Sequence, residues 1–224
     1  MSVSVIIPSR TARNIVQCVG VIRHKDPRLA VIVVDDGISL HPWPDVLYGS
    51  CIIKGKKPFC YATNCNLGIR MALANSSCNG VILLNDDALL QTSCGFSLLA
   101  GVGMCHPEVG VLSAVCNRIG NQNQKPGQLP EFRYDLRVLA FVCVYIPRST
   151  FDKIGFLDER FTAYGCEDVD YCKRVLDVGL KLGITEGCMV DHQSLPSSFG
   201  SSASKKSLLL EGRRIYAEKW GVQP

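Results

Sequence analysis

The sequence lacks any long hydrophobic run, although apolar residues make up 47% of its 224 positions. The longest apolar segments, such as Val31–Val34 and Val81–Leu84, have the length of a strand. A helix that crosses a membrane needs about 20 apolar residues, so no transmembrane segment is expected. The first ten residues also lack the basic and apolar regions of a secretory signal peptide. The length suits a single domain, 1–224.

A strong excess of one charge is also missing. The chain has 24 Lys and Arg against 20 Asp and Glu, which gives a formal net charge of +4. This balance permits an anionic ligand, but domains that bind nucleic acids are usually more basic.

Twelve cysteines are present, yet no two of them have the C-x-x-C spacing of small zinc sites. Many lie inside apolar segments, as Cys18, Cys116 and Cys143 do. We therefore expect reduced, mostly buried thiols that pack as small hydrophobic side chains. The compartment that this predicts is a reducing cytoplasm.

The common glycine-rich nucleotide motifs are absent too. No G-x-G-x-x-G follows the first apolar run, and Gly55-Lys56-Lys57 does not fit the motif G-x-x-x-x-G-K-[ST]. The G-x-S-x-G elbow of hydrolases is also missing. A ligand that carries phosphate would therefore be held by a metal ion and side chains, not by a glycine cradle.

What the sequence does contain is a regular alternation of strand and helix patterns. Apolar runs predict strands at 3–7, 30–34, 51–53, 81–84, 109–116, 139–146, 182–185 and 188–190. Helical spacing predicts helices at 12–25, 62–75, 96–104, 166–178 and 208–220. Polar composition predicts mobile loops at 117–130 and 194–206. Together these patterns indicate an α/β fold with a mostly parallel central sheet flanked by helices.

Three predicted strands end in unusual polar groups. These groups are Pro8-Ser9-Arg10, Asp35-Asp36-Gly37 and Asn85-Asp86-Asp87. In an open parallel sheet, ligands bind at the carboxyl ends of the strands. Two acidic pairs at one edge repel each other, and a divalent metal with an anionic ligand would relieve that repulsion. Either pair alone would also suit an ordinary turn, so their joint occurrence carries the argument.

A second acidic cluster, Glu167, Asp168 and Asp170, opens the helix predicted at 166–178. Acidic residues stabilise the positive end of a helix, and this explanation suits Asp170. A carboxylate that faces a cleft can instead accept a proton from a hydroxyl group, and we expect this of Asp168. His192 directly follows the strand predicted at 188–190, and is either a surface residue or a metal ligand.

At these residues the sequence resembles the inverting family 2 glycosyltransferases of the GT-A fold, closest to their rhamnosyltransferase-like branch. The resemblance rests on VSVIIPSR (3–10), VIVVDDG (31–37), NLGIRMALAN (66–75), VILLNDDA (81–88), IGFLDERFTAYGCEDVDYCKR (154–174) and YAEKWG (216–221). It covers nearly the whole chain in the right order. It implies that 1–116 binds the nucleotide-sugar and that 117–224 carries the acceptor and catalytic residues.

The resemblance also implies a nucleoside-diphosphate-sugar donor such as a UDP-sugar, a divalent metal (Mn²⁺ or Mg²⁺) and a carboxylate base. By motif position, Asp168 would be the base with Glu167 beside it, and Asp87 and His192 would ligate the metal. The donor residues would be Pro8, Ser9 and Arg10 at the base, Asp36 on the base, Asp86 on the ribose, and Asn64 and Asn66 near the sugar or phosphate. Arg10 departs from the family, which usually has an aromatic residue there, but a guanidinium plane also stacks on a base.

The implied reaction is a single displacement that inverts the anomeric carbon. The acceptor stays open among a glycan, a lipid-linked glycan and a hydroxylated DNA base, the substrate of some viral transferases. The basic spots 54–57, 205–206 and 213–214 would contact DNA phosphates or are solvated surface charge. The location would be the cytoplasm, the membrane periphery or, for a viral enzyme, the host cytoplasm. A nucleotide-sugar-binding protein without catalysis and a nucleotidyltransferase remain alternatives, and the oligomeric state is open.

Overall fold

The computed structural model describes residues 2–38, 42–162, 165–197 and 202–224. The strands are β1 (Ser2–Ser9), β2 (Ala30–Asp35), β3 (Cys51–Lys54), β4 (Cys78–Leu84), β5 (Leu89–Leu90), β6 (Val109–Cys116), β7 (Phe132–Asp135), β8 (Cys143–Pro147) and β9 (Lys181–Asp191). The helices are α1 (Ala12–Lys25), α2 (Tyr61–Leu73), α3 (Gly95–Cys105), α4 (Arg148–Ile154), α5 (Glu167–Asp177) and α6 (Ser202–Trp220), with short 3-10 turns at Asp45–Leu47 and Gln122–Gln124. Among the described residues, no helix combines the length and the apolar character that crossing a membrane requires.

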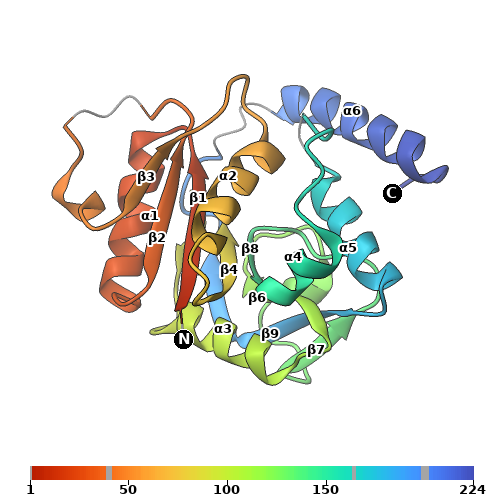
Figure 1. The fold of residues 1–224 in the computed structure, drawn as a ribbon, viewed down its shortest axis with the longest axis horizontal. Coiled ribbons are helices and arrows are strands. Elements are labelled where there is room, and N and C mark those ends of the chain that lie inside the picture. The colour runs from red at the N-terminus through yellow and green to blue at the C-terminus, as the bar shows by residue number, and fades with distance from the viewer. Residues whose placement is uncertain (1, 39–41, 163–164, 198–201) are drawn as a thin grey trace.

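All nine strands belong to one sheet, in the order β3-β2-β1-β4-β8-β6-β9-β5 with β7 paired to β9. Strand β1 runs parallel to β2 and β4, and β2 runs parallel to β3. Strand β8 then lies antiparallel between β4 and β6, while β6 and β9 are parallel. The sheet is therefore more mixed than the sequence predicts. Because β1, β2 and β4 are parallel, their carboxyl ends meet at one edge, the upper one in Figure 1.

Helices cover both faces of the sheet (Figure 1). Helices α1 and α3 pack on one face, and α2, α4 and α5 pack on the other, each over its own buried apolar cluster. The side chains of strand β1 pack into the helix layers on both faces of the sheet. Val5 and Ile7 belong to the first cluster and Ile6 to the second, since neighbouring side chains point to opposite faces. The continuous apolar runs of the sequence thus become strands that are buried on both sides.

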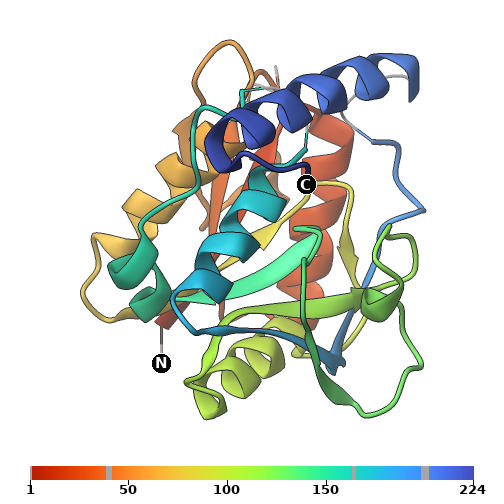
Figure 2. The same ribbon diagram turned by 90° about the vertical axis from the view of Figure 1, so that its right-hand side faces the viewer.

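Helix α6 packs on α5 and not on the sheet, and it lies across the top of the molecule in Figure 2. A small separate cluster that contains Phe161, Cys166 and Tyr216 joins the two helices. Asp170 of α5 is fully buried and accepts a hydrogen bond of 2.9 Å from Trp220 Nε1. Lys219 Nζ lies 2.6 Å from the same carboxylate. Asp170 therefore holds α6 against α5. This role differs from the stabilisation of a helix end that the sequence suggested for Asp170.

Several elements differ from the sequence expectation. Strands β5 and β7 and helix α4 were not predicted, because two to seven residues are too few to show a repeat. The strand predicted at 139–146 begins only at Cys143. Before it, the amide of Gln124 bonds both main-chain groups of Ala140 and so replaces a neighbouring strand. The two strands predicted at 182–190 form the single strand β9, with a register irregularity opposite Ala114 and Val115.

The segment 117–130 was predicted to be mobile, but it is held by many hydrogen bonds. The Arg133 guanidinium donates to several of its carbonyl groups, including that of Asn123 at 2.6 Å. Arg133 also pairs with Glu186 at 2.8 Å, and Glu186 accepts a hydrogen bond from the Gly127 amide. This bonding does not support free movement of the segment. Of the other predicted mobile loop, 194–206, the part 198–201 lies outside the described residues.

All twelve cysteines are free thiols, and nine of them are buried. The exceptions are Cys51, Cys94 and Cys105. The expectation of mostly buried thiols is confirmed. Burial raises the pKa of those such as Cys172 well above the range of an exposed thiol, which makes them poor nucleophiles.

Helix α3 offers a matched pair of glycines that tests its packing on the sheet. A Cβ atom on Gly103 would lie 2.5 Å from the Tyr145 ring, whereas one on Gly101 would meet no atom within 4 Å. We expect Gly103→Ala to lower the free energy of unfolding by about 1–3 kcal/mol through overpacking. Gly101→Ala should raise it by about 0.5–1 kcal/mol through helix propensity. Urea denaturation of both variants measures the difference, and equal effects would contradict this placement of α3.

Candidate active site

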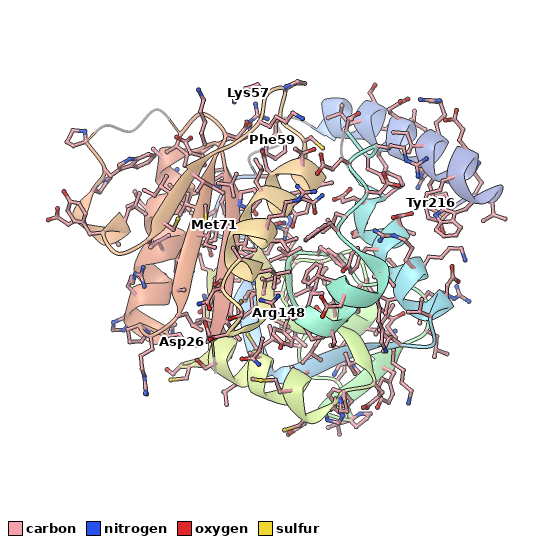
Figure 3. The ribbon with its side chains drawn as sticks, in the orientation of Figure 1. Asp26, Lys57, Phe59, Met71, Arg148 and Tyr216 are labelled. Atoms are coloured by element: carbon pink, nitrogen blue, oxygen red, sulfur yellow. The ribbon has the colours of Figure 1, made fainter. Side chains whose placement is uncertain are left out.

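A cavity of about 290 Å³ lies at the carboxyl ends of β1 and β4. In Figure 3 the labelled Lys57 and Phe59 mark this edge of the molecule, while Asp26 and Arg148 lie lower, toward the amino ends of the parallel strands. The cavity is lined from both halves of the sequence. Its polar and aromatic wall residues are Arg10, Phe59, Tyr61, Asn85, Asp86, Asp87, Arg118, His192 and Ser197. We call it the first cavity.

A second cavity of about 470 Å³ adjoins the first. The two share Tyr61, Asn85, Arg118, Ile119, Gly120 and His192 as wall residues. Glu167 and Asp168, at the start of α5, line the second cavity and not the first. The structure thus brings the strand-end group around Asp87 and the α5 carboxylates to two sides of one recess, as the sequence predicts.

Ser9 supports the first cavity from behind. Its hydroxyl donates a hydrogen bond of 2.7 Å to Asp86 Oδ2, and its carbonyl accepts one of 2.9 Å from the Asp36 amide. Ser9 is buried and is not part of the cavity wall, whereas Asp86 is. Ser9 therefore orients Asp86, and the predicted direct contact between Ser9 and a nucleobase is not supported.

Asp36 also lies beneath the surface of the site. Its carboxylate is fully buried, with Lys57 Nζ at 3.1 Å and Arg10 Nε at 3.7 Å, and it lines neither cavity. The contact between Asp36 and a nucleobase therefore stays a prediction, because both carboxylate oxygens lack a hydrogen-bond partner among the described residues although two cations lie beside them. Arg10 lines the first cavity, and its guanidinium lies 5.1 Å from the centre of the Phe59 ring. Phe59 supplies the aromatic surface that position 10 lacks.

Asn64 and Asn66 do not reach either cavity, which corrects the second donor prediction. The Asn66 amide donates to the Leu157 carbonyl at 2.9 Å, and its oxygen accepts from the Leu157 amide at 3.1 Å. Asn64 Oδ1 accepts a hydrogen bond of 2.9 Å from the Lys56 amide. Both side chains are buried and hold neighbouring segments against α2.

Asp87 and His192 lie together although 105 residues separate them. His192 Nδ1 faces the Arg118 carbonyl at 2.9 Å, and Nε2 lies 3.1 Å from Asp87 Oδ1. In an octahedral shell with bonds of about 2.1 Å, neighbouring ligand atoms are about 3 Å apart, so this pair fits a divalent metal. Carboxylate and imidazole together suit Mn²⁺. No cluster of three or more such ligands occurs in the part of the chain that the structure describes.

The carboxylates of α5 follow a strained turn. Gly165 and Cys166 both have left-handed backbone angles, with φ of 86° and 73°. For a residue with a Cβ atom this conformation costs about 1–2 kcal/mol. The turn presents the first residues of α5, Glu167 and Asp168, to the second cavity.

Burial raises the pKa of both carboxyl groups. Loss of solvent, followed by the charge of Asp168, raises the pKa of Glu167 to about 8. Burial also raises the pKa of Asp168, although main-chain amides such as that of Val169, at 2.8 Å, oppose the rise. The two groups titrate as a pair, so Glu167 retains a proton at neutral pH more readily than an ordinary glutamate.

Several wall residues were missed by the sequence reasoning. Arg118 follows the end of β6, so the strand-end rule that found Asp87 applied to it as well. Leu209 and Arg213 reach the second cavity from α6, and Pro224 reaches it from the chain that follows. Arg213 belongs to the basic spot 213–214, but no local pattern places any of these last residues at a cavity, because only the packing of α6 on α5 brings them there.

The sequence matches no protein-family model and no curated protein. Solved structures do match, in 301 chains, so the fold is common and does not by itself identify a substrate. GalNAc-T7, crystallised with UDP, GalNAc and Mn²⁺, aligns at a TM-score of 0.75 and 12% identity over 98% of this chain and 48% of its own. S. aureus TarS, residues 1–349, aligns at 0.63 and 13% over 99% and 74%. The chain thus has the predicted α/β fold, that of GT-A glycosyltransferases, and spans about half the length of GalNAc-T7.

The carboxyl pair gives a prediction about pH. Glu167 has a pKa of about 8 in the folded state against a usual value of 4.5, so between these pH values only the unfolded state releases the proton, and the stability of the fold decreases as pH rises. In Asp168→Asn the neighbouring negative charge is gone, and the pKa of Glu167 should fall. Carbon-13 NMR of the glutamate carboxyl groups measures it, and Glu167→Gln identifies the resonance by its loss. An unchanged titration in Asp168→Asn would contradict the interaction.

Proposed function

We propose that the chain is a metal-dependent, inverting glycosyltransferase that moves a sugar from a nucleoside-diphosphate-sugar to an acceptor hydroxyl. The observation that carries the proposal is the pair of adjoining cavities, with Asp87 and His192 in one and Asp168 in the other. A donor that spans the shared wall would have its diphosphate near His192 and its sugar facing Asp168. The sequence resemblance adds family 2 and its rhamnosyltransferase-like branch to this proposal.

The first cavity suits the nucleoside part of the donor. Asp86 is oriented by Ser9 and lines the wall, where a carboxylate can accept hydrogen bonds from ribose hydroxyls. Arg10 and Phe59 present planar surfaces on which a base can stack, with Pro8 beside them. The crystal structure of GalNAc-T7 with UDP and Mn²⁺ supports a UDP-sugar and Mn²⁺ as the first pair to test.

Asp87 and His192 would hold the metal. When bound, the ion would offset the negative charge that collects on the leaving diphosphate. Two protein ligands leave the other coordination positions to phosphate oxygens and water, so metal and donor should bind together. The Arg118 carbonyl fixes the ring of His192 through Nδ1, which directs Nε2 toward Asp87.

Asp168 would act as the base. As the acceptor oxygen forms its bond to the anomeric carbon, the bond from that carbon to the diphosphate oxygen breaks, and the hydroxyl proton passes to Asp168. Burial makes Asp168 a stronger base than an exposed aspartate. None of the six wall residues that both cavities share has a carboxylate, which favours one displacement with inversion over a covalent sugar intermediate.

The other proposed classes are less well supported. A protein that only binds nucleotide-sugars has no need of a carboxylate positioned as a base across from the donor, as Asp168 is. The nine buried thiols support a reducing compartment, and hence the cytoplasm.

Replacement of the base tests the mechanism. With a panel of nucleotide-sugars and Mn²⁺, we expect Asp168→Asn to lower transfer by about 10²–10⁴-fold, since the acceptor proton has no acceptor. Calorimetry should show unchanged affinity for UDP. Asp177→Asn, at an exposed position of the same helix, is the matched control and should keep full activity. A wild-type transfer rate in Asp168→Asn would remove Asp168 from the mechanism.

The metal pair has its own test. We expect Asp87→Ala and His192→Ala each to weaken Mn²⁺ binding in the presence of UDP by at least about 10-fold, because each removes one of two protein ligands. Electron paramagnetic resonance of free Mn²⁺ measures the affinity. His106→Ala is the control, since His106 pairs with Glu108 outside both cavities. Unchanged affinity in the first two variants would place the metal elsewhere.

A further inference from the structure

Three arginines that line the cavities around Asp168 have no hydrogen-bond or ion-pair partner among the described residues. The half of the chain from 117 to 224 contains eight arginines. Five of them bond carboxylates or carbonyl groups: Arg133, Arg148, Arg160, Arg174 and Arg214. Within the described ranges, the guanidinium groups of Arg118, Arg137 and Arg213 make no hydrogen bond or ion pair. These same three line the cavities that meet around Asp168.

A third cavity, of about 570 Å³, adjoins the second at Asp168. It shares Gly120, Ala140 and Asp168 with the second cavity. Arg137 lines this third cavity, while Arg213 lines the second. Asp168 is therefore at the junction of the two cavities, and each has an unpaired guanidinium.

The wall of the third cavity is built on a buried carboxylate. Asp135 accepts hydrogen bonds from the side-chain amides of Asn121 and Asn123, at 2.9 and 3.0 Å. It also accepts one of 2.9 Å from the main-chain amide of Arg137. These bonds fix the backbone beneath Arg137 and leave the exposed side chain of Gln122 in the same wall. Amide groups of this kind suit the hydroxyls of a sugar.

The charge of Arg137 and Arg213 is not needed by the groups already described. Only Arg118 of the three also borders the first cavity, where the donor diphosphate would lie. The pKa values of Glu167 and Asp168 are raised, so the guanidinium groups do not neutralise the carboxyl pair. A guanidinium binds a phosphate or carboxylate through two parallel hydrogen bonds.

We propose that the acceptor is an acidic saccharide, whose reacting hydroxyl lies at Asp168 while its phosphate or carboxylate group contacts Arg137 and Arg213. This deepens the proposed function and rests on it. A DNA acceptor fits less well, because two of the basic residues that would contact its backbone, Lys57 and Arg214, are paired within the protein, whereas Arg213 lines the second cavity. Lys57 lies against Asp36, and Arg214 against two glutamates of α6.

The test compares saccharides that differ only in charge. NMR titrations would use glucose, glucose 6-phosphate and glucuronic acid, with UDP and Mn²⁺ saturating so that phosphate cannot occupy the donor cavity. We expect both acidic sugars to bind about 10- to 100-fold more tightly than glucose, the effect of one charge-assisted interaction. Arg137→Gln and Arg213→Gln should each reduce this ratio about 10-fold or more. Arg28→Gln, at an unpaired exposed arginine outside the cavities, should not change it.

Each other outcome overturns the inference. Equal affinity for neutral and acidic sugars would show that the protein does not recognise an anionic group on the acceptor. An equal effect of Arg28→Gln would show that the preference reflects the overall charge of the protein. Binding of duplex DNA that depends on Arg137 and Arg213, without discrimination among the sugars, would assign the arginines to a polynucleotide. The same titrations without UDP separate the two proposals. If UDP does not bind but the arginine-dependent preference persists, the proposed donor fails and the acidic ligand stands.

Discussion

The parallel pairing of β1 with β2 and β4 is the constraint from which the site follows. It brings Asp36, Asp86 and Asp87 to one edge of the sheet, where their charges repel. Each carboxylate is offset by a different group. Lys57 lies beside Asp36, the Ser9 hydroxyl bonds Asp86, and His192 bonds Asp87. Asp86 and Asp87 line the first cavity, whereas Asp36 lies beneath it.

The strands of the second half of the sheet bring further side chains to this edge through antiparallel and parallel pairing. Strand β5 has two residues, yet its antiparallel pairing places Leu89 opposite Asp191 of β9. The residue after Asp191 is His192, so this short pairing, together with the parallel pairing of β9 with β6, brings the imidazole to Asp87. Helix α5 approaches from the side, and its strained first turn supplies the carboxyl pair. The recess is therefore formed by the ends of the parallel strands, by the residues that follow β9 and by the start of α5.

The sequence predicted the elements that have a long periodic pattern of apolar residues and the polar residues that directly follow a strand. The helix at 12–25 and the strand at 109–116 have the predicted bounds, because each pattern is long and its apolar positions face a core. Asp87 and His192 were predicted as a pair and do lie together. Asn66 was placed at the donor by resemblance alone, and the local Leu157 main chain takes its hydrogen bonds instead. Arg137 gave no signal, and Arg213 gave only that of a basic spot, because the lack of a partner for an arginine becomes visible only in the structure.

The carboxyl end of the chain has a practical consequence. Pro224 lines the second cavity, close to the α5 carboxylates, whereas β1 begins at the far end of the parallel strands, beside the N mark in Figure 1. A purification tag or fluorescent fusion joined after Pro224 would therefore lie at the second cavity and restrict entry to it. A label joined before β1 would lie at the opposite end of the parallel strands, away from the cavities. That end is therefore the better attachment point for immobilising the protein on a sensor or resin.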